Sequence, residues 1–333
     1  MRPMGEFELL ARIRERLPAD GPRIHLGSGD DAAVSVPAGA TATSVDALVD
    51  GVHFRRDLAS PAQIGHKALA TALSDLAAMG AEAGEAYVVL GLPPDFSEDE
   101  CIEMLDGMTA LASATGTELV GGDLSRAGEL FLAITVIGHA PTADAFVTRG
   151  GAHPGDVLVL TGEIGGAAGG LVLLDDDERR IDHTLGGEKL RASLIGRQLE
   201  PTPRLAAGSA LASAGATAMI DLSDGLGADA GHMAKASGVK LAIEADAVPL
   251  SAAARTLSEA TGRDPWRLLN GGEDYELLAS IPPERVDAAR RRVEEAEKDV
   301  ALTEIGAVIA GSGVEIRLPG CRLLEPGGFD QLA

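Results

Sequence analysis

Short apolar segments that run into acidic residues recur along the chain, and they constrain its fold more than any other feature. Residues 41–45, 117–120 and 217–220 are typical of strands, and each is followed by an Asp beside Ser or Gly. A strand end fixes the backbone while small neighbours leave room for a ligand. We therefore expect these acids and similar groups elsewhere to form one distributed site. The groups are Gly29-Asp30-Asp31, Ser44-Val45-Asp46, Ser74-Asp75, Gly121-Gly122-Asp123, Asp221-Leu222-Ser223-Asp224 and Gly271-Gly272-Glu273-Asp274.

The chemistry of these groups indicates metal and phosphate. Carboxylates are preferred hard-oxygen ligands of Mg²⁺, and small neighbouring residues let the backbone approach a phosphate closely. Any single group is better explained as an ordinary turn, because Asp beside Gly or Ser is common in loops. The interpretation therefore depends on the whole set.

The net charge narrows the possible partners. The chain has 51 Asp and Glu against 28 Lys and Arg, a net charge of −23, which opposes nonspecific binding to nucleic acid or an anionic membrane. A nucleotide would also be repelled unless divalent cations lay between its phosphates and the carboxylates. The alternative is a solvated acidic surface adapted to high salt or to solubility, and both explanations can hold together.

The pattern of apolar residues predicts a two-domain chain in which strands and helices alternate. At 333 residues the chain exceeds the usual size of one hydrophobic core. Helical spacing covers 64–81, 99–116 and 226–237. Between 139 and 154 this periodicity weakens while Pro and Gly accumulate. We expect an N-terminal domain over 1–140 and a C-terminal domain over 150–333.

Several common classes of site and location are disfavoured. No apolar stretch is long enough to span a bilayer, and residues 1–6 do not lead into the apolar run of a signal peptide, so a cytoplasmic location is expected. Cys101 and Cys321 are isolated, which argues against a zinc site or a disulfide framework. No Gly-x-x-x-x-Gly-Lys-Ser/Thr loop occurs. The Gly-rich turn at 161–166 is weak evidence for phosphate binding, and we interpret it as the tight start of a helix.

The ordered motifs resemble the thiamine-monophosphate kinase family, and the resemblance extends over nearly the whole chain, from Gly5 to Asp330. The runs around His53 and Glu273 look specific to this family within its superfamily. The matching segments are Gly29 to Ala33, Asp46 to Phe54, Lys67 to Ala70, Leu73 to Ala81, Gly121 to Asp123, Asp221 to Leu226 and Gly271 to Leu278.

This resemblance implies a two-domain fold of mixed α/β (α+β) type, like that of the aminoimidazole ribonucleotide synthetases, with a ferredoxin-like N-terminal domain and an α+β C-terminal domain. It also implies a homodimer, several Mg²⁺ ions, and ATP and thiamine monophosphate as substrates. The domain over 1–140 would bind ATP and Mg²⁺ and form the dimer, and the domain over 150–333 would complete the nucleotide and substrate sites. The implied metal-binding residues are Asp30, Ser44, Val45, Asp46, Asp75, Asp123, Asp221 and Asp224; those for ATP are Gly122, Asp123, Arg149 and Ser223; those for thiamine monophosphate are His53, Glu273 and Phe329.

Three positions depart from the family pattern. Val45 and Leu124 stand where Thr is usual, so any metal contact at Val45 must come from its backbone carbonyl. Phe329 occupies a position often held by Trp or Tyr, which keeps an aromatic face for a substrate ring and removes the polar tip. None of these changes removes an acidic residue.

The expected reaction is direct in-line transfer of the ATP γ-phosphoryl group to the phosphate of thiamine monophosphate, which yields thiamine diphosphate and ADP. A phosphate monoester is already a competent nucleophile near neutral pH, so no general base is expected. The main obstacle is repulsion between two anions, which metal ions and Arg149 would neutralise. Asp75 and Asp224 are expected to be the most critical residues.

Three other functions are compatible with the acidic groups. A sister ATP-dependent synthetase acting on selenide or a formylglycinamidine substrate is the nearest, although the reactive Cys-Lys pair expected near the N-terminus of a selenide enzyme does not occur. A metal-dependent phosphohydrolase is the second. A noncatalytic metal-binding protein is the third, although no EF-hand loop spacing occurs.

Overall fold

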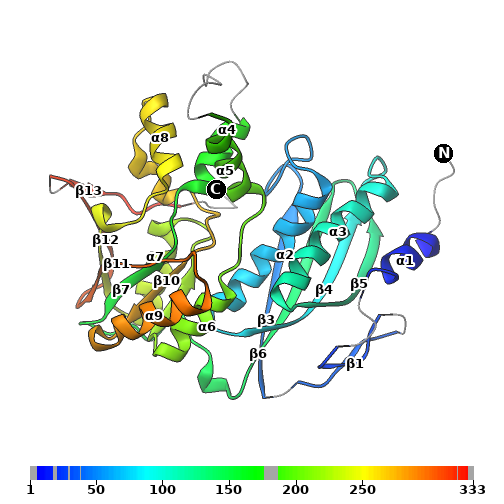
Figure 1. Cartoon of the computed structure of the whole chain (residues 1–333), viewed down its shortest axis with the longest axis horizontal. Coiled ribbons are helices and arrows are strands. Elements are labelled where there is room, and N and C mark those ends of the chain that lie inside the picture. Colours follow the sequence, from blue (N-terminus) through cyan, green and yellow to red (C-terminus); the bar gives the residue numbers. More distant parts are fainter. Residues whose placement is uncertain are drawn as a thin grey trace. The chain divides into compact units, whose positions relative to one another are not determined.

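The chain separates into two compact units. Figure 1 shows the ribbon of the whole chain, coloured from the N-terminus (blue) to the C-terminus (red). The computed structural model describes residues 6–17, 21–28, 31–37, 39–175, 187–320 and 322–328. Unit 1 comprises Met1–Leu76 and Ala81–Ala143, and unit 2 comprises Ala77–Gly80 and Asp144–Ala333. The nucleotide-binding, dimerisation and substrate-binding roles expected of the two domains stay predictions.

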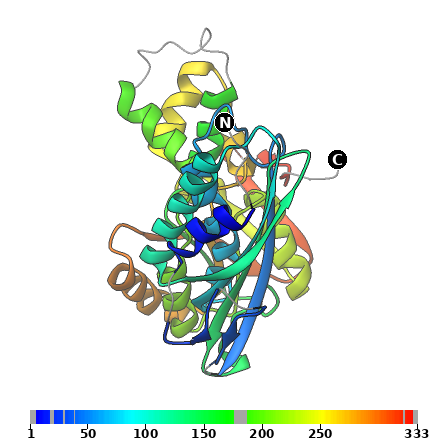
Figure 2. The same ribbon diagram turned by 90° about the vertical axis from the view of Figure 1, so that its right-hand side faces the viewer.

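Unit 1 is built on a four-stranded sheet in the order β3-β6-β4-β5. Helices α2 and α3 lie on one face of this sheet (Figures 1 and 2). A small antiparallel pair, β1 and β2, precedes the sheet. The elements are α1 (Glu6–Arg14), β1 (Ile24–Leu26), β2 (Val34–Ser35), β3 (Ala40–Val49), α2 (Pro61–Ala78), β4 (Glu82–Leu92), α3 (Glu98–Thr115), β5 (Glu118–Arg126) and β6 (Phe131–Ala140).

The two covering helices have clear sequence causes. Ser97 and Glu100 form a capping box at the start of α3, and Gly116 ends that helix in the left-handed conformation. Helices α2 and α3 approach each other at two glycines. A Cβ at Gly65 would lie 1.9 Å from the Met104 carbonyl oxygen, and one at Gly107 would lie 2.0 Å from that of Ala62. Larger residues at either position would force these helices apart.

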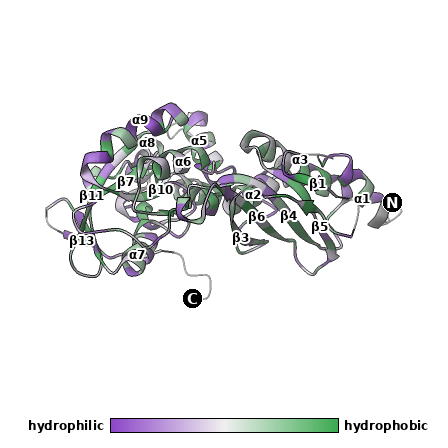
Figure 3. Ribbon diagram, turned by 90° about the horizontal axis from the view of Figure 1, so that it is seen from below, coloured by the Kyte–Doolittle hydropathy of each residue, from purple (hydrophilic) through white to green (hydrophobic). Residues whose placement is uncertain are grey.

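The other face of this sheet, which we call the open face, is largely apolar, and none of the described helices of unit 1 covers it. Along β6 the side chains alternate, so that Ile134 and Val136 are fully buried while Ala133 and Thr135 are half-buried. Cross-strand partners share a face, which places Val45 and Val89 beside Thr135 and Ala133, 62% and 37% exposed. Figure 3 shows the predominantly apolar character of these strands.

Unit 2 is a seven-stranded sheet, in the order β13-β12-β9-β11-β7-β10-β8, with a hydrophobic cluster on each face. In β7, Leu158 and Leu160 pack into one cluster while Val159 packs into the other. This explains why the strand is continuously apolar. The elements are β7 (Val157–Thr161), α4 (Gly166–Asp175), α5 (Gly187–Leu199), α6 (Leu205–Ala214), β8 (Ala218–Asp221), α7 (Leu226–Ser237), β9 (Lys240–Glu244), α8 (Ala252–Thr261), β10 (Leu277–Ile281), α9 (Val286–Ala296), β11 (Leu302–Ile309), β12 (Gly313–Leu318) and β13 (Arg322–Leu324), with 3₁₀ turns at Ala143–Ala145, Ala245–Ala247, Pro265–Asn270 and Pro283–Arg285.

The structure confirms most of the predicted elements and corrects two strand ends. Helix α7 has the predicted bounds, 226–237. Strand β3 continues to Val49, so Asp46 lies inside the strand and not at its end. Strand β5 continues to Arg126, so Asp123 is likewise internal. Cross-strand pairing with β6 and β4 carries both strands past their acidic residues. Within the described residues, no helix is both long and apolar enough to cross a membrane.

Candidate active site

Three polar residues of unit 1 meet on the helix-covered side of the sheet. Ser44 and Asp46 share one face of β3, and the Ser44 hydroxyl donates a hydrogen bond to the Asp75 carboxylate from α2. Burial, together with the nearby Asp75 carboxylate, raises the pKa of Asp46 to about 6. Val45 points to the opposite face, as alternation along a strand requires. Two carboxylates and a hydroxyl are therefore gathered where sequence reasoning expected metal ligands.

Asp123 lies far from this group within one chain. The strand register aligns Asp123 with Val89, Ala133 and Ala47 across the sheet. Three strand spacings separate β5 from β3, which is about 14 Å. Asp123 also shares the open face with Val89, whereas Asp46 points to the helix side. The expected grouping of Asp123 with Asp46 is thus not formed by a single copy of unit 1.

The acidic turn of unit 2 follows β8. Asp221 ends that strand and is 3% exposed, and Ser223 and Asp224 follow in the turn before α7. Asp229, which the sequence reasoning missed, accepts hydrogen bonds from the backbone N–H groups of Asp224 and Gly225, both at 3.0 Å. Its burial, with the nearby carboxylates, raises its pKa to about 8. The sequence feature that could have identified Asp229 is its place in the first turn of α7, where a carboxylate is stabilised by the N-terminus of the helix.

Glu273 lies in a loop that is bonded to this acidic turn. The Glu273 N–H donates to the Ser223 carbonyl at 2.8 Å, and the Tyr275 N–H donates to the Leu222 carbonyl at 2.9 Å. Both donor residues have positive φ, 59° and 51°, a conformation that costs energy for residues other than Gly. The candidate substrate carboxylate and the candidate metal carboxylates of unit 2 are therefore held on one backbone framework.

Two carboxylates turned into the core anchor the Glu273 loop. Asp274 accepts hydrogen bonds from the Gly165 N–H at 2.7 Å and the Ala167 N–H at 3.2 Å, at the start of α4. This agrees with interpreting the Gly-rich turn as a tight helix start, since a protein carboxylate already takes these N–H groups. Glu276 is fully buried and pairs with both the Nε and Nη2 atoms of Arg204, at 2.8 and 2.6 Å.

Asp274 gives a test of these buried contacts. Burial raises the pKa of Asp274 from its usual 3.8 to about 6, although the N–H donors and Arg197 lower it; the Glu276 carboxylate adds to the rise. The folded carboxyl therefore binds its proton more tightly than the unfolded one, and its contribution to stability falls as pH rises from about 4 to 6. Asp274→Asn does not titrate. The free energy of unfolding of the wild-type protein, measured relative to that of the variant, should therefore fall by roughly 1 kcal/mol between about pH 5 and pH 7.

Urea unfolding of both proteins at the two pH values measures this difference. Asp246→Asn, at an exposed position of the same unit, is the control and should show no such change. A difference for Asp274→Asn that is independent of pH would contradict the assignment.

His53 and Arg149 are each held by local hydrogen bonds. The His53 Nδ1 accepts the Val49 N–H at 3.1 Å, so in the neutral ring the proton is on Nε2. Arg149 is exposed, and its carbonyl oxygen accepts a hydrogen bond from the Ser237 hydroxyl at 3.1 Å. The same hydroxyl accepts the N–H groups of Gly151 and Ala152, which fixes the loop that carries Arg149.

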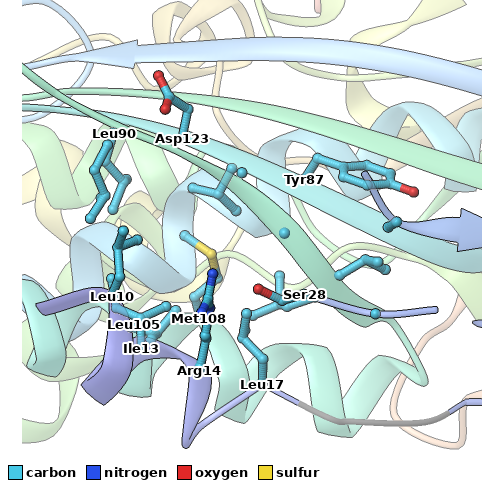
Figure 4. A pocket seen from close by; sticks show the side chains of 18 of the residues that line it. Leu10, Ile13, Arg14, Leu17, Ser28, Tyr87, Leu90, Leu105, Met108 and Asp123 are labelled. Atoms are coloured by element: carbon cyan, nitrogen blue, oxygen red, sulfur yellow. The ribbon is translucent and has the colours of Figure 1, made fainter. Parts of the chain in front are cut away.

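A pocket of about 510 Å³ lies within unit 1, between α1, α3, and strands β4 and β5. Its walls are largely apolar, with Leu10, Ile13 and Met108 among the side chains labelled in Figure 4, and Gly122 is part of the lining. A Cβ at Gly122 would be 1.7 Å from the Val88 carbonyl oxygen, so glycine is required there. In Figure 4 the Asp123 carboxylate points away from Leu10 and Leu90.

Two predicted site residues, Asp30 and Phe329, lie outside the described residues. Over the described ranges, no group of three or more His, Cys, Asp or Glu side chains has an arrangement that could hold a metal ion. The carboxylates that do lie near one another, Asp75 near Asp46 and both Asp221 and Asp224 near Asp229, belong to separate units.

Comparison with known proteins gives a consistent result. Residues 29–140 match the AIR synthase related protein N-terminal domain, and residues 153–319 match the C-terminal domain. The thiamine-monophosphate kinase of Mycobacterium tuberculosis is 40% identical over 288 residues, which cover 84% of this chain and 81% of that protein. The crystal structure of that kinase from Stenotrophomonas maltophilia has a TM-score of 0.82 and 38% identity, and covers 94% of this chain and 96% of the other.

A further solved structure, described as AaThiL complexed with AMPPCP and TMP, has a TM-score of 0.75 and 30% identity, and covers 97% of this chain and 96% of the other. These matches confirm the expected two-domain AIR synthase-like fold with mixed α and β content.

Proposed function

Because the chain belongs to the thiamine-monophosphate kinase family, we propose that it transfers the γ-phosphoryl group of ATP to the phosphate of thiamine monophosphate. The products are thiamine diphosphate and ADP, so the enzyme is a phosphotransferase with a phosphate group as acceptor. The observation that supports this most directly is the similar structure described with AMPPCP and TMP together, an ATP analogue beside the phosphate acceptor.

The donor atoms of both units fit Mg²⁺. Ser44, Asp46 and Asp75 offer hard oxygens in unit 1, and Asp221 and Asp224 offer them in unit 2. These residues would hold Mg²⁺, which when bound neutralises the repulsion between the two anionic substrates. The few basic residues of the chain are consistent with this arrangement, since the net charge is −23.

The remaining site residues bind and orient the substrates. The Nε2–H of His53 is a donor suited to a phosphate oxygen, because Nδ1 is already an acceptor for Val49. Arg149 provides a fixed positive charge on a loop braced by Ser237. The acceptor phosphate is itself the nucleophile, so no side chain is needed as a general base.

The apolar pocket of unit 1 suits the adenine base of ATP. Its volume of about 510 Å³ and its Leu and Met lining from α1 and α3 suit a flat apolar ring system. Gly122 lets the backbone approach the nucleotide, and Ser28 and Asp31 also line this pocket.

We propose that the chain forms a homodimer through the open face. None of the described helices of unit 1 covers this largely apolar face, and β3 and β5 are the edge strands of its sheet. A second copy would cover the face. If Asp123 binds the same metals as Asp46, it must come from the second copy, because within one chain the two residues lie on opposite faces and three strands apart.

Val89→Arg tests the dimer. A charge at the centre of the open face, where Val89 is 37% exposed, is expected to give a monomer in sedimentation velocity experiments and to remove most kinase activity. Leu323→Arg is the matched control, because it places the same charge at another exposed apolar residue, which belongs to unit 2 and not to the sheet of unit 1. A Val89→Arg protein that stays dimeric would refute the proposed interface.

A product assay tests the function itself. The protein is incubated with ATP, Mg²⁺ and either thiamine monophosphate or thiamine, and the products are identified by chromatography. Thiamine diphosphate formed only from thiamine monophosphate supports the proposal. Phosphate release without an acceptor would indicate a hydrolase instead. The cytoplasmic location expected from the sequence agrees with ATP as a substrate and stays a prediction.

A further inference from the structure

The loop from Gly271 to Glu276 has a strained backbone and two buried carboxylates, more than one contact with a substrate requires. Strained residues and residues with buried carboxylates alternate along it. Glu273 and Tyr275 adopt positive φ, while Asp274 and Glu276 direct their carboxylates into the core. A backbone of this kind persists only where its surroundings determine it, since residues other than Gly are strained at positive φ.

Helix α5 supplies the contacts that determine the Glu273 side chain. Gln198 is 4% exposed, and its Nε2 donates a hydrogen bond to the Glu273 Oε2. Its neighbour Arg197 donates from Nη2 to the Glu163 carbonyl at 2.9 Å and to Glu276 at 3.1 Å. Two consecutive residues of one helix therefore bind the side chain of Glu273 and the anchor of its loop.

Helix α5 is itself held firmly against α4. A Cβ at Gly170 would lie 2.2 Å from the Leu194 carbonyl oxygen and 2.8 Å from the Gln198 Cβ, so the two helices meet at the closest distance that glycine allows. Leu194 is fully buried in this contact. The amide of Gln198 thus comes from a fixed position, and a buried donor on a rigid element restricts the rotamers of the carboxylate that it binds.

We propose that Gln198, supported by Arg197, is a positioning residue that sets the affinity for thiamine monophosphate by orienting Glu273. This proposal rests on the function proposed above, in which Glu273 contacts the substrate. Gln198 acts through Glu273 and does not touch the metal-binding residues.

The decisive variant is Gln198→Met, which keeps the length of the side chain and removes its donor. We expect the KM for thiamine monophosphate to rise roughly tenfold, as the loss of one hydrogen bond to a charged group predicts. The KM for ATP and the kcat should stay within twofold. Ser258→Ala, which removes another buried polar group of unit 2, is the matched control and should change none of these constants.

A double-variant cycle separates positioning from a general effect on stability. If Gln198 acts through Glu273, then Gln198→Met should have little further effect on the KM for thiamine monophosphate once Glu273→Met, which removes the acceptor of the Gln198 hydrogen bond, is present. Additive effects of the two changes, or equal rises in the KM of both substrates, would overturn the proposal.

Hydrogen exchange supplies a readout that does not depend on activity. The backbone amides of Glu273 and Tyr275 are donors to the acidic turn, and we expect them to exchange faster in Gln198→Met than in wild type. Unchanged exchange would overturn the proposal even in an active enzyme. A wild-type protein that makes no thiamine diphosphate would refute the proposed function separately, and the exchange result would still decide whether Gln198 holds the loop.

Discussion

Replacing Asp75 with Asn is expected to lower kcat by at least about 100-fold, with the protein still folded. Asp75 lies on α2 against Ser44, and its carboxylate is close enough to Asp46 to raise the pKa of that residue. Asn keeps the shape of the side chain and removes the charge that would hold Mg²⁺. Asp224→Asn is expected to behave in the same way from unit 2. Steady-state kinetics at saturating ATP, Mg²⁺ and thiamine monophosphate measure the loss.

Two matched controls accompany these variants. Asp99→Asn changes an exposed acidic residue of unit 1, and Asp246→Asn changes one of unit 2. Both should keep near-normal turnover, so that a change of net charge alone is excluded as the cause. Thermal unfolding should give similar Tm values for all four proteins. Near-normal turnover in both Asp75→Asn and Asp224→Asn would refute the role proposed for the carboxylates.

Replacing Arg204 with Met is expected to lower the free energy of unfolding by about 3 kcal/mol. Arg204 forms a bidentate pair with Glu276, which is fully buried, and a further pair with Glu297 at 2.6 Å. The variant leaves the Glu276 carboxylate in the core, where Arg197 at 3.1 Å and the Thr161 hydroxyl at 2.7 Å still donate hydrogen bonds to its oxygens. Removing one partner of a buried pair costs far more than the pair contributes in total.

Urea unfolding of the wild-type and variant proteins measures this cost. Arg317→Met is the matched control, because Arg317 pairs with Glu244 and Glu315 at the surface, where ion pairs contribute little. It should unfold at the same urea concentration as wild type. If both Arg variants lowered the free energy of unfolding equally, burial would not be the reason for the expected effect at Arg204.

Much of the fold could be predicted from the order of residues. Helical spacing and a terminal glycine gave α7 its bounds, and a capping box and Gly116 mark the ends of α3. These signals are local, since hydrogen bonds within a few residues decide where a helix begins and ends. Strand ends were less predictable. Strands β3 and β5 run past Asp46 and Asp123 because neighbouring strands pair with those residues, and no local signal reports a partner far along the chain.

The candidate site divides in the same way. The sequence by itself determined which residues carry metal-binding and phosphate-binding chemistry, because carboxylate and hydroxyl side chains beside glycine have that chemistry in any fold. Only the tertiary structure decided which of them meet. It brings Ser44 and Asp46 to Asp75, and turns Val45 and Asp123 to the open face. It also introduces Asp229, Gln198 and Arg204, whose roles depend on burial and on partners distant in sequence. Packing and strand register, which arise between segments, set these relations.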